Sequence, residues 1–558
     1  MNNSAIADSF SMLAKLMDIN GENSFKAKSY SLAAFAIEKL PVQLQEIPLS
    51  EMEKLKGIGV SAAKKIQELL KTGTLIQLEE IIFLTPPGVI EMLKIKGIGP
   101  KKIHIIWKQM QLESVGELLY ACKENRLKLF KGFGEKTQQS VIENIEFYFR
   151  NKGSFLYAQL IYGAEQFLLF LQKKFADKRV LITGEFARQM EIITVLEFVV
   201  EEHIDAVENT LKTQQGLEFI EKGTSFILYK TVIGVKVKIH SGKEHFIEKY
   251  IETSSSDNFL LKITEHFNSP VTAKTEEEYF SIRKLPVVPA FLREDEEILT
   301  LKQPFTKHLH PSEIKGLIHC HSNWSDGNNT IEEMAKAAMQ RGMEYMAITD
   351  HSKTASYAQG LKDEQIKAQH QYIDELNIKL APFKIFKSIE SDILSDGNLD
   401  YSDNILSTFD LVIASVHSNL KMTEEKAMKR LLTAIENPYT TILGHLTGRL
   451  LLSRPSYPLN FKTIIDACAA NNVVIELNAN PNRLDIDWRE IKYALQKNVL
   501  ISVNPDAHSL DGIDDIKYGV FSAQKAMLPK EKNLSSFSLA AFEEFIEDRK
   551  NNRIKKSW

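Results

Sequence analysis

The hydrophobic pattern beyond residue 315 consists of short apolar runs, each ending on a polar residue that can bind a metal. The seven runs read GLIHCH, MAITDH, KIFKSIE, LVIASVH, TILGH, VVIELN and LISVNPDAH. They end on His321, His351, Glu390, His417, His445, Asn478 and His508, with His319 and Asp506 as further polar positions. A residue at the end of a β-strand lies at the mouth of its sheet. Seven such ends in succession predict a barrel whose carboxyl rim holds a metal cluster.

The first part of the chain has a different pattern, in which a glycine turn precedes an amphipathic helix. The unit occurs as LKGIG at 55–59, as IKGIG at 95–99 and, more weakly, as FKGFG at 130–134. Two glycines around one apolar residue allow a tight turn and a close approach to a ligand. The amides that begin the following helix can then bind a phosphate. The spacing predicts repeated helical units.

These units resemble helix-hairpin-helix motifs, which bind the DNA backbone without sequence preference. The residues expected to contact DNA are Gly57, Gly59, Lys64, Lys65, Gly97, Gly99, Lys101 and Lys102. The alternative is an ordinary glycine turn between two helices, which a single copy would favour. Two near-identical copies with trailing lysine pairs favour DNA binding. The third copy lacks the lysine pair, which favours a structural role there.

Composition narrows the class of protein. The 558 residues predict three or four domains, and 25% charged residues are usual for a soluble globular protein. A net charge of −4 gives no overall basic field, although one basic face can be offset elsewhere. Cys122, Cys320 and Cys468 are too far apart for a disulfide framework or a thiolate zinc site, and Cys320 is expected to be buried. With neither a signal-peptide pattern nor a membrane-length apolar run, we expect a cytoplasmic protein.

The middle of the chain, from about 154 to 293, reads as a small α+β domain. A helical stretch, AQLIYGAEQFLLFLQKKF, precedes the strand candidates VLITG, SFILYK and GVKVKIH. With glycine-turn repeats before it and metal motifs after it, the chain resembles the bacterial X-family DNA polymerases that carry a C-terminal polymerase-and-histidinol-phosphatase (PHP) domain. The sequence VVPAF before Leu292-Arg293-Glu294 supports this, and the resemblance covers nearly the full length.

The resemblance implies a multidomain fold. An N-terminal all-α region carries the helix-hairpin-helix motifs, a central α+β part resembles a nucleotidyltransferase palm and thumb, and a distorted (β/α)7 PHP barrel follows. The expected domains are a helical domain at 1–85, a helical fingers-like domain at 86–150, a degenerate palm at 151–235, a thumb-like domain at 236–297, a linker at 298–315 and the PHP domain at 316–558.

The central domain departs from the family at its catalytic positions. The family has Gly-Ser, then two aspartates one residue apart and a third on a later strand, which together hold two magnesium ions. In this chain Glu185 follows Gly184, and the three aspartate positions fall on Val195, Glu197 and Lys238. A valine cannot bind magnesium and a lysine repels it. We therefore predict that this domain does not polymerise DNA and survives as a scaffold or DNA clamp.

The PHP motifs, in contrast, are intact. The resemblance implies three divalent ions held by His319, His321, Asp326, His351, Glu390, His417, His445, Asp506 and His508. It favours manganese for activity, and imidazole with carboxylate also suits zinc or iron. No further catalytic side chain is expected, because a metal-bound hydroxide serves as the nucleophile. Asp350 is expected to orient a neighbouring histidine.

Basic residues near these motifs are candidates for holding a substrate phosphate. They are Lys353, Arg449 and Arg483, and a structural salt bridge is an equal alternative for each. The family usually has Pro where Leu446 stands and Thr or Ser where Pro505 stands, but neither change removes a ligand.

The leading prediction is a metal-dependent phosphodiesterase of DNA repair, with 3′→5′ exonuclease or 3′-end processing activity in base-excision repair. The expected partner is gapped, nicked or 3′-recessed DNA, bound without sequence specificity by a monomer in the cytoplasm, at the nucleoid. One alternative is a small-molecule phosphomonoesterase of the histidinol-phosphatase type. Others are a DNA-binding scaffold whose two active sites have both lapsed and a working X-family polymerase.

Overall fold

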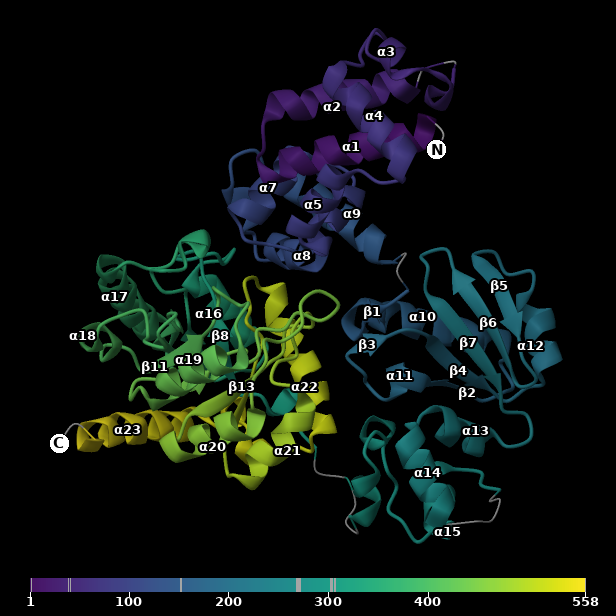
Figure 1. Cartoon of the computed structure of the whole chain (residues 1–558). Coiled ribbons are helices and arrows are strands. Elements are labelled where there is room, and N and C mark those ends of the chain that lie inside the picture. The colour runs from purple at the N-terminus through teal and green to yellow at the C-terminus, as the bar shows by residue number, and fades with distance from the viewer. Residues whose placement is uncertain are drawn as a thin grey trace. The chain divides into compact units, whose positions relative to one another are not determined.

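The computed structural model describes residues 1–556 except 2, 39, 41, 151–152, 267–271, 302–304 and 306–307. Part of the expected linker at 298–315 therefore lies outside the described residues. The chain forms two compact units, Met1–Tyr148 and Phe149–Trp558 (Figure 1). In the described part of the chain, no helix is both long enough and apolar enough to span a membrane.

The first unit is all-helical, as the glycine-turn pattern predicts. Its helices are α1 (Asn3–Asn20), α2 (Ser24–Glu38), α3 (Leu49–Met52), α4 (Val60–Thr72), α5 (Ile76–Leu84), α6 (Pro87–Glu91), α7 (Pro100–Lys108), α8 (Val115–Lys123) and α9 (Glu135–Arg150). Phe10 of α1 packs edge-on against Tyr30 of α2, with ring centroids 5.8 Å apart. The apolar faces of α4 and α7 are buried through Ile66 and Ile103.

The second unit begins with an α+β part. Its strands are β1 (Phe155–Leu156), β2 (Val180–Thr183), β3 (Ile192–Ile193), β4 (Leu196–Val200), β5 (Leu217–Lys222), β6 (Phe226–Thr231) and β7 (Lys236–Ser241). Its helices are α10 (Tyr157–Lys174), α11 (Gly184–Ala187), α12 (Ile204–Leu211), α13 (Phe246–Thr253), α14 (Asp257–His266) and α15 (Glu276–Ile282). The main sheet has the order β2-β4-β7-β6-β5, with β4 and β7 parallel. The strand candidates VLITG, SFILYK and GVKVKIH are thus confirmed as β2, β6 and β7.

The rest of the second unit is the expected barrel. The strands are β8 (Gly316–Cys320), β9 (Tyr345–Ile348), β10 (Lys384–Asp392), β11 (Leu411–Ser415), β12 (Ile442–Leu443), β13 (Val474–Asn478) and β14 (Ile501–Asn504). The helices are α16 (Ile331–Gln340), α17 (Asp363–Leu380), α18 (Asp403–Leu406), α19 (Glu424–Glu436), α20 (Phe461–Asn471), α21 (Trp488–Gln496), α22 (Ile516–Lys525) and α23 (Leu539–Lys556). All seven strands are parallel and follow chain order. A bridge between Cys320 and Ala507 brings the first and last strand ends together, so the barrel is nearly closed.

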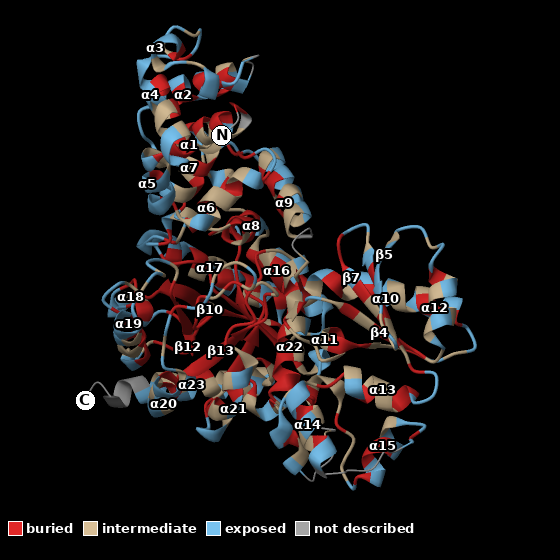
Figure 2. Cartoon of the chain, turned by 45° about the vertical axis from the view of Figure 1, so that its right-hand side comes forward, coloured by how far each residue is buried: buried red, intermediate tan, exposed pale blue. Residues whose placement is uncertain are grey.

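Two apolar cores explain why the barrel strands are almost wholly buried, as Figure 2 shows for β10, β12 and β13. Alternate strand residues face inward, and Phe386 of β10 packs there with Phe542 of α23 at 4.8 Å between ring centroids. The intervening residues, such as Ile385, pack outward in the core that includes residues of the surrounding helices. Burial on both faces is why these strands read as continuous apolar runs.

Candidate metal centre

The inward face of the barrel changes from apolar to polar along each strand. In β10 the inner core residue Phe386 is followed at alternate positions by Glu390 and Asp392; in β13, Val474 is followed by Glu476 and Asn478. Residues two apart on a strand share a face, so these polar side chains line the inside at the carboxyl ends. All four are buried. The fold therefore places a polar layer above the inner apolar core.

A bulge in β8 brings two histidines to this layer. The register between β8 and β9 shifts between Ile318 and Cys320, and His319 has a φ of 63°. Such a bulge lets two successive side chains point to one side. Ile318 lies in the inner core and His319 joins the polar layer, while Cys320 packs outward, where its thiol donates to the carbonyl of Ala347 at 3.6 Å. The expected burial of Cys320 is confirmed, and burial raises the pKa of its thiol.

Glu390 lies among four histidines of the cluster. Its Oε1 is 3.2 Å from Nε2 of His319, 3.2 Å from Nε2 of His417 and 3.0 Å from Nε2 of His445. Its Oε2 is 3.0 Å from Nδ1 of His351. Glu390 and these four histidines could therefore bind divalent ions together.

Two aspartates complete the cluster. Oδ1 of Asp506 lies 3.1 Å from Nε2 of His321 and 3.3 Å from Nε2 of His319. Oδ1 of Asp326 lies 3.4 Å from Nε2 of His508, and its Oδ2 lies 3.6 Å from Nε2 of His351. The structure thus brings together all nine side chains that the sequence marks as ligands. Eight of them form three overlapping groups: His321, Asp326, His351 and His508; His319, His321 and Asp506; and His351, Glu390 and His417. The ninth, His445, joins the cluster through its contact with Glu390.

The donor atoms fit divalent ions. Nε2 of His319, Nδ1 of His321, Oδ2 of Asp326 and Oε2 of Glu390 are buried and accept or donate no hydrogen bond among the described residues. A buried polar atom without a partner costs free energy, and several converging on one region indicate an ion. Imidazole nitrogen and carboxylate oxygen suit zinc, manganese or iron.

The electrostatics of the histidines differ by position. Burial lowers the pKa of His319, but the carboxylates of Glu476, Asp506 and Glu390 outweigh it and hold this pKa well above its usual value. Burial and the neighbouring rings of His508 and His351 lower the pKa of His321 to about 3. His321 is therefore a neutral imidazole at physiological pH, which is the form that binds a metal.

Two carboxylates beneath the cluster escaped the sequence analysis. Oε1 of Glu476 lies 2.5 Å from Nδ1 of His319, and Oε2 accepts from the backbone N–H of His445 at 2.7 Å. Asp392 is hydrogen-bonded to Nδ1 of His417. Each carboxylate holds its histidine with Nε2 towards the cluster. The signal was present, because each lies two residues from a marked strand residue, Asn478 or Glu390.

The prediction that Asp350 orients a neighbouring histidine is wrong. The Asp350 carboxylate accepts from the backbone N–H and the hydroxyl of Ser322, each at 2.7 Å, from the hydroxyl of Ser325 at 2.5 Å and from Gln369 at 2.7 Å. None of these partners, within the part of the chain that the structure describes, is a histidine. Asp350 instead fixes the loop that leads to Asp326.

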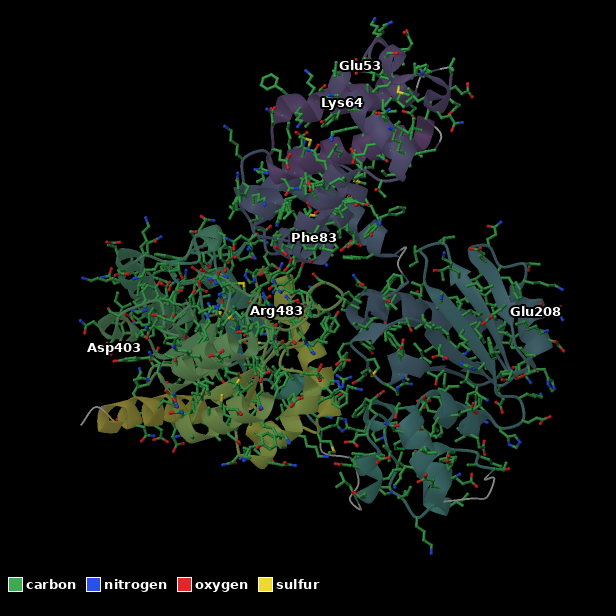
Figure 3. All side chains as sticks on the ribbon, viewed as in Figure 1. Glu53, Lys64, Phe83, Glu208, Asp403 and Arg483 are labelled. Carbon is green, nitrogen blue, oxygen red and sulfur yellow. The ribbon has the colours of Figure 1, made fainter. Side chains whose placement is uncertain are left out.

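The three basic candidates differ in their surroundings. Arg449 donates to the carbonyl of Arg483 at 2.9 Å, to the carbonyl of Leu484 and to Asp487 at 2.5 Å, which favours the structural alternative. Lys353 is exposed, with Nζ 3.6 Å from Asp363. Arg483, labelled in Figure 3, is nearly buried, and its Nε lies 3.7 Å from Oδ2 of Asp506. Arg483 is thus the candidate beside the cluster.

The positions of the family's polymerase carboxylates also come together, but with different chemistry. Glu197 and Lys238 are Cα partners on β4 and β7, and Val195 lies just before β4. Oε2 of Glu197 lies 2.7 Å from Nε2 of His240, while Nζ of Lys238 lies 4.2 Å from the centre of the Phe226 ring. Among the described residues of this sheet, no three metal-capable side chains converge.

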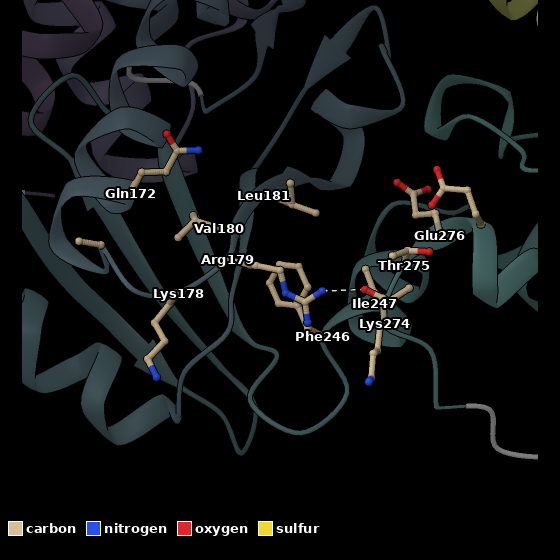
Figure 4. A pocket seen from close by; sticks show the side chains of 12 residues that line it. Gln172, Lys178, Arg179, Val180, Leu181, Phe246, Ile247, Lys274, Thr275 and Glu276 are labelled. Atoms are coloured by element: carbon tan, nitrogen blue, oxygen red, sulfur yellow. Dashed lines mark hydrogen bonds between the residues drawn. The ribbon is translucent and has the colours of Figure 1, made fainter.

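A separate cavity of about 560 Å³ lies at the opposite end of β2, between α10, α13 and the start of α15 (Figure 4). Its arginine is engaged with the protein. Arg179 lies over the Phe246 ring at 4.4 Å, pairs with Glu201 at 3.0 Å and donates to the carbonyl of Lys274 at 2.8 Å.

The three glycine turns have the backbone that the pattern predicts. Gly57, Gly97 and Gly132 have φ of 91°, 87° and 96°, and α4, α7 and α9 begin three residues later. The two lysines of each pair differ in their surroundings. Lys64 (labelled in Figure 3) and Lys101 are exposed, whereas Nζ of Lys65 lies 5.8 Å from the Tyr30 ring centre and Nζ of Lys102 donates to the carbonyl of Gly97 at 3.2 Å. The first and second turns thus each offer one exposed lysine in the first turns of the following helix.

Comparison with known proteins agrees with this division. Residues 1–75 match the family model described as a helix-hairpin-helix domain, residues 89–146 match a SAM-like helix-hairpin-helix tandem, and residues 318–480 match the PHP domain. A "DNA polymerase/3'-5' exonuclease PolX" of Bacillus subtilis (strain 168) is 30% identical over 556 residues, covering 96% of this chain and 97% of that protein. A "probable phosphatase" of Thermoanaerobacter sp. (strain X514) is 29% identical over 196 residues, covering 32% of this chain and 73% of the relative.

The full-length similarity spans the helical unit, the central sheet and the barrel, and the family models lie on the parts with the glycine turns and the metal cluster. The chain belongs to the bacterial X-family DNA polymerases that carry a C-terminal PHP domain.

Proposed function

We propose that this enzyme uses its PHP barrel as a metal-dependent phosphodiesterase that removes nucleotides from the 3′ end of DNA, and that its central sheet does not polymerise DNA. The observation that carries the proposal is the convergence of nine buried or half-buried histidine, aspartate and glutamate side chains in one cluster, with Glu390 among four of the histidines. The central sheet offers one carboxylate, Glu197, at the three corresponding polymerase positions.

The three groups of ligands would each hold one divalent ion, and manganese is the ion we propose for activity. Such ions lower the pKa of bound water and neutralise the charge of a phosphodiester during hydrolysis. Glu476 and Asp392 hold the rings of His319 and His417 in place. The guanidinium of Arg483, beside Asp506, is placed to hold a phosphate oxygen; Lys353 is a more distant candidate.

The central sheet supports the second half of the proposal. The Glu197 carboxylate is already paired with His240, and a Cβ added at Gly184 would lie 2.4 Å from its Oε1, so Glu197 packs directly on that turn. Lys238 is the register partner of Glu197 and places an ammonium where the family has an aspartate. This arrangement suits a scaffold or DNA clamp.

We further propose the domain limits expected from the sequence, except that the palm extends beyond 235 through β7, because β7 pairs with β4 and β6. We also propose that the glycine-turn units bind gapped, nicked or 3′-recessed DNA by its backbone. Exposed Lys64 and Lys101 beside α4 and α7 support backbone contact. The enzyme would then act as a monomer in base-excision repair, in the cytoplasm at the nucleoid.

A small-molecule phosphomonoesterase is the second candidate, because relatives named probable phosphatases match the barrel region. The helix-hairpin-helix units favour DNA, since a metabolite enzyme has no use for a backbone clamp. A 3′-recessed duplex that inhibits hydrolysis of p-nitrophenyl phosphate at submicromolar concentration would favour the DNA enzyme. Absence of inhibition at any accessible concentration would favour the small-molecule enzyme.

The direct test is incubation of the full chain with manganese and a 5′-end-labelled, 3′-recessed duplex. We expect stepwise shortening from the 3′ end by the wild type. We expect no shortening by His319→Ala, because this change removes a metal ligand that lies beside two carboxylates of the cluster. The matched control is His203→Ala. His203 is an exposed residue just before α12 and lies far from the cluster in the sequence and in the fold. Shortening that persists at full rate in His319→Ala would contradict the proposal.

A further inference from the structure

The palm segment that follows α11 packs against the barrel within the second unit. Lys525, at the end of α22, donates from Nζ to the carbonyl of Arg188 at 2.6 Å. Tyr157, at the start of α10, packs edge-on against Phe521 with ring centroids 5.8 Å apart. This segment follows Gly184 and Glu185, where the family polymerases hold the nucleotide. The part of the palm that has lost its nucleotide chemistry is therefore a contact surface for the barrel.

The contact reaches the loop that carries Arg483. Residues Gln189–Glu191 of the palm and Pro481 and Leu484 of the barrel line one cavity of only about 10 Å³, with room for about one water. The loop between β13 and α21 thus lies directly on the palm. Arg483 stands between Pro481 and Leu484, with its Nε 3.7 Å from Asp506.

A run of ion pairs joins the same two places. Oε1 of Glu191 lies 3.0 Å from Nη1 of Arg489, and the same Nη1 lies 2.9 Å from Oδ1 of Asp487. Oδ2 of Asp487 pairs with Arg449 at 2.5 Å, and Arg449 donates to the carbonyl of Arg483 at 2.9 Å. Glu191 is buried, so loss of Arg489 would leave a buried carboxylate without this cation, although the Arg489 side chain itself is 47% exposed.

We propose that Glu191 of the degenerate palm is a positioning residue for the barrel's phosphodiesterase site, acting through Arg489, Asp487 and Arg449 on the loop that carries Arg483. The proposal rests on the proposed function in one respect, that Arg483 contacts the substrate phosphate. It explains why the palm remains in a chain that has lost the polymerase carboxylates. The palm holds the substrate arginine of another active site.

The positioning itself is tested without any activity, by hydrogen–deuterium exchange of the full-length protein. The loop amides are protected by bonds such as Arg483 N–H to the Asn480 carbonyl at 2.8 Å and Asp485 N–H to the Asn478 carbonyl at 3.2 Å. We expect Glu191→Gln to raise exchange in peptides covering 479–487 with no change in strands β9 to β11. The matched control is Glu201→Gln, which breaks a palm ion pair with Arg179 at 3.0 Å (Figure 4 shows Arg179). Unchanged exchange at 479–487 in Glu191→Gln would overturn the proposal.

The catalytic consequence is tested by a double-mutant cycle on the labelled duplex with manganese. We expect Glu191→Gln to raise the KM for DNA about three- to tenfold with metal content unchanged, and to have no further effect in an Arg483→Ala background. An equal effect in both backgrounds would overturn the route through Arg483. If the wild type hydrolyses bis-p-nitrophenyl phosphate but not DNA, the assignment of DNA as the substrate is wrong. The same double-mutant cycle measured with that ester then tests the positioning role of Glu191 separately.

Discussion

At the residue scale, the carboxylates beneath the cluster decide how the ligands face. Glu476 contacts both the ring of His319 and the backbone of His445, and Asn504 and Asn478 donate to its carboxylate at 2.8 Å and 3.2 Å. A buried carboxylate with this many donors is rigid. It therefore fixes two of the nine ligands by one side chain.

Glu476→Gln should weaken metal binding because an amide cannot accept from His319, His445 and Asn504 together. We expect roughly a 10- to 100-fold loss of affinity. The measurement is manganese retained per chain against a graded chelator. Glu543→Gln, which removes a surface partner of Lys384 at 2.5 Å, is the control and should retain the native affinity. Equal retention in the two variants would show that Glu476 does not support the ligands.

Lys525 gives a prediction about pH. Burial lowers the pKa of this ammonium to about 8, which is below its ordinary value, although Glu294 and Glu191 oppose the shift. Between that pH and the ordinary lysine pKa, the unfolded chain binds a proton that the folded chain releases, so the free energy of unfolding rises with pH. Lys525→Met should abolish this contribution. Between about pH 8 and about pH 10, the melting temperature of the wild type should rise relative to that of the variant. A difference between the two melting temperatures that stays constant over this range would contradict the prediction.

At this scale the sequence predicted most of the residues of the site. The prediction was wrong where the hydrogen-bond partners of a side chain depend on the path of a loop. Eight of the nine cluster residues stand at or next to the ends of apolar runs, Asp326 was implied by the family resemblance alone, and all nine side chains converge. Asp392 and Glu476 were missed although alternation puts them on the same face as Glu390 and Asn478. The partners of Asp350 were wrong, because the turn through Ser322 and Ser325 folds back on it and the sequence does not specify that path.

At the element scale, the strand and helix patterns were reliable because both faces of each barrel strand are buried. The bulge at His319 was not predictable, since GLIHCH has no residue that requires a positive φ. The helix starts after Gly59 and Gly99 were predictable from their glycine turns, and the backbone there gives a sharp test.

Gly97 and Gly99 separate stability from DNA binding. Both have open space where an added Cβ would lie, but Gly97 has a φ of 87° whereas Gly99 has a φ of −91°. Gly97→Ala should therefore cost about 1–2 kcal/mol of stability. Gly99→Ala should cost less stability than Gly97→Ala, since Gly99 is the N-cap of α7 with an ordinary negative φ. It should weaken DNA binding, because its methyl group stands where a phosphate would approach the start of α7. Melting temperature and duplex titration measure the two; Gly99→Ala binding DNA as the wild type does would argue against contact at this turn.

At the scale of the whole molecule, the domain order and the identity of the chemistry followed from the motifs, but the contact between palm and barrel did not. That contact depends on single residues far apart in sequence, such as Glu191 with Arg489 and Arg188 with Lys525. No periodicity marks such pairs. The two parts lie in one compact unit, which the proposed positioning role of the palm requires.

The central claim is that the barrel is the sole catalytic centre. The most direct measurement is one reaction with the labelled 3′-recessed duplex, manganese and all four deoxynucleoside triphosphates, resolved at single-nucleotide length. We predict stepwise shortening in the wild type and an unchanged primer in His319→Ala. Template-directed lengthening of the primer, above all in His319→Ala where no nuclease would mask it, would contradict the account.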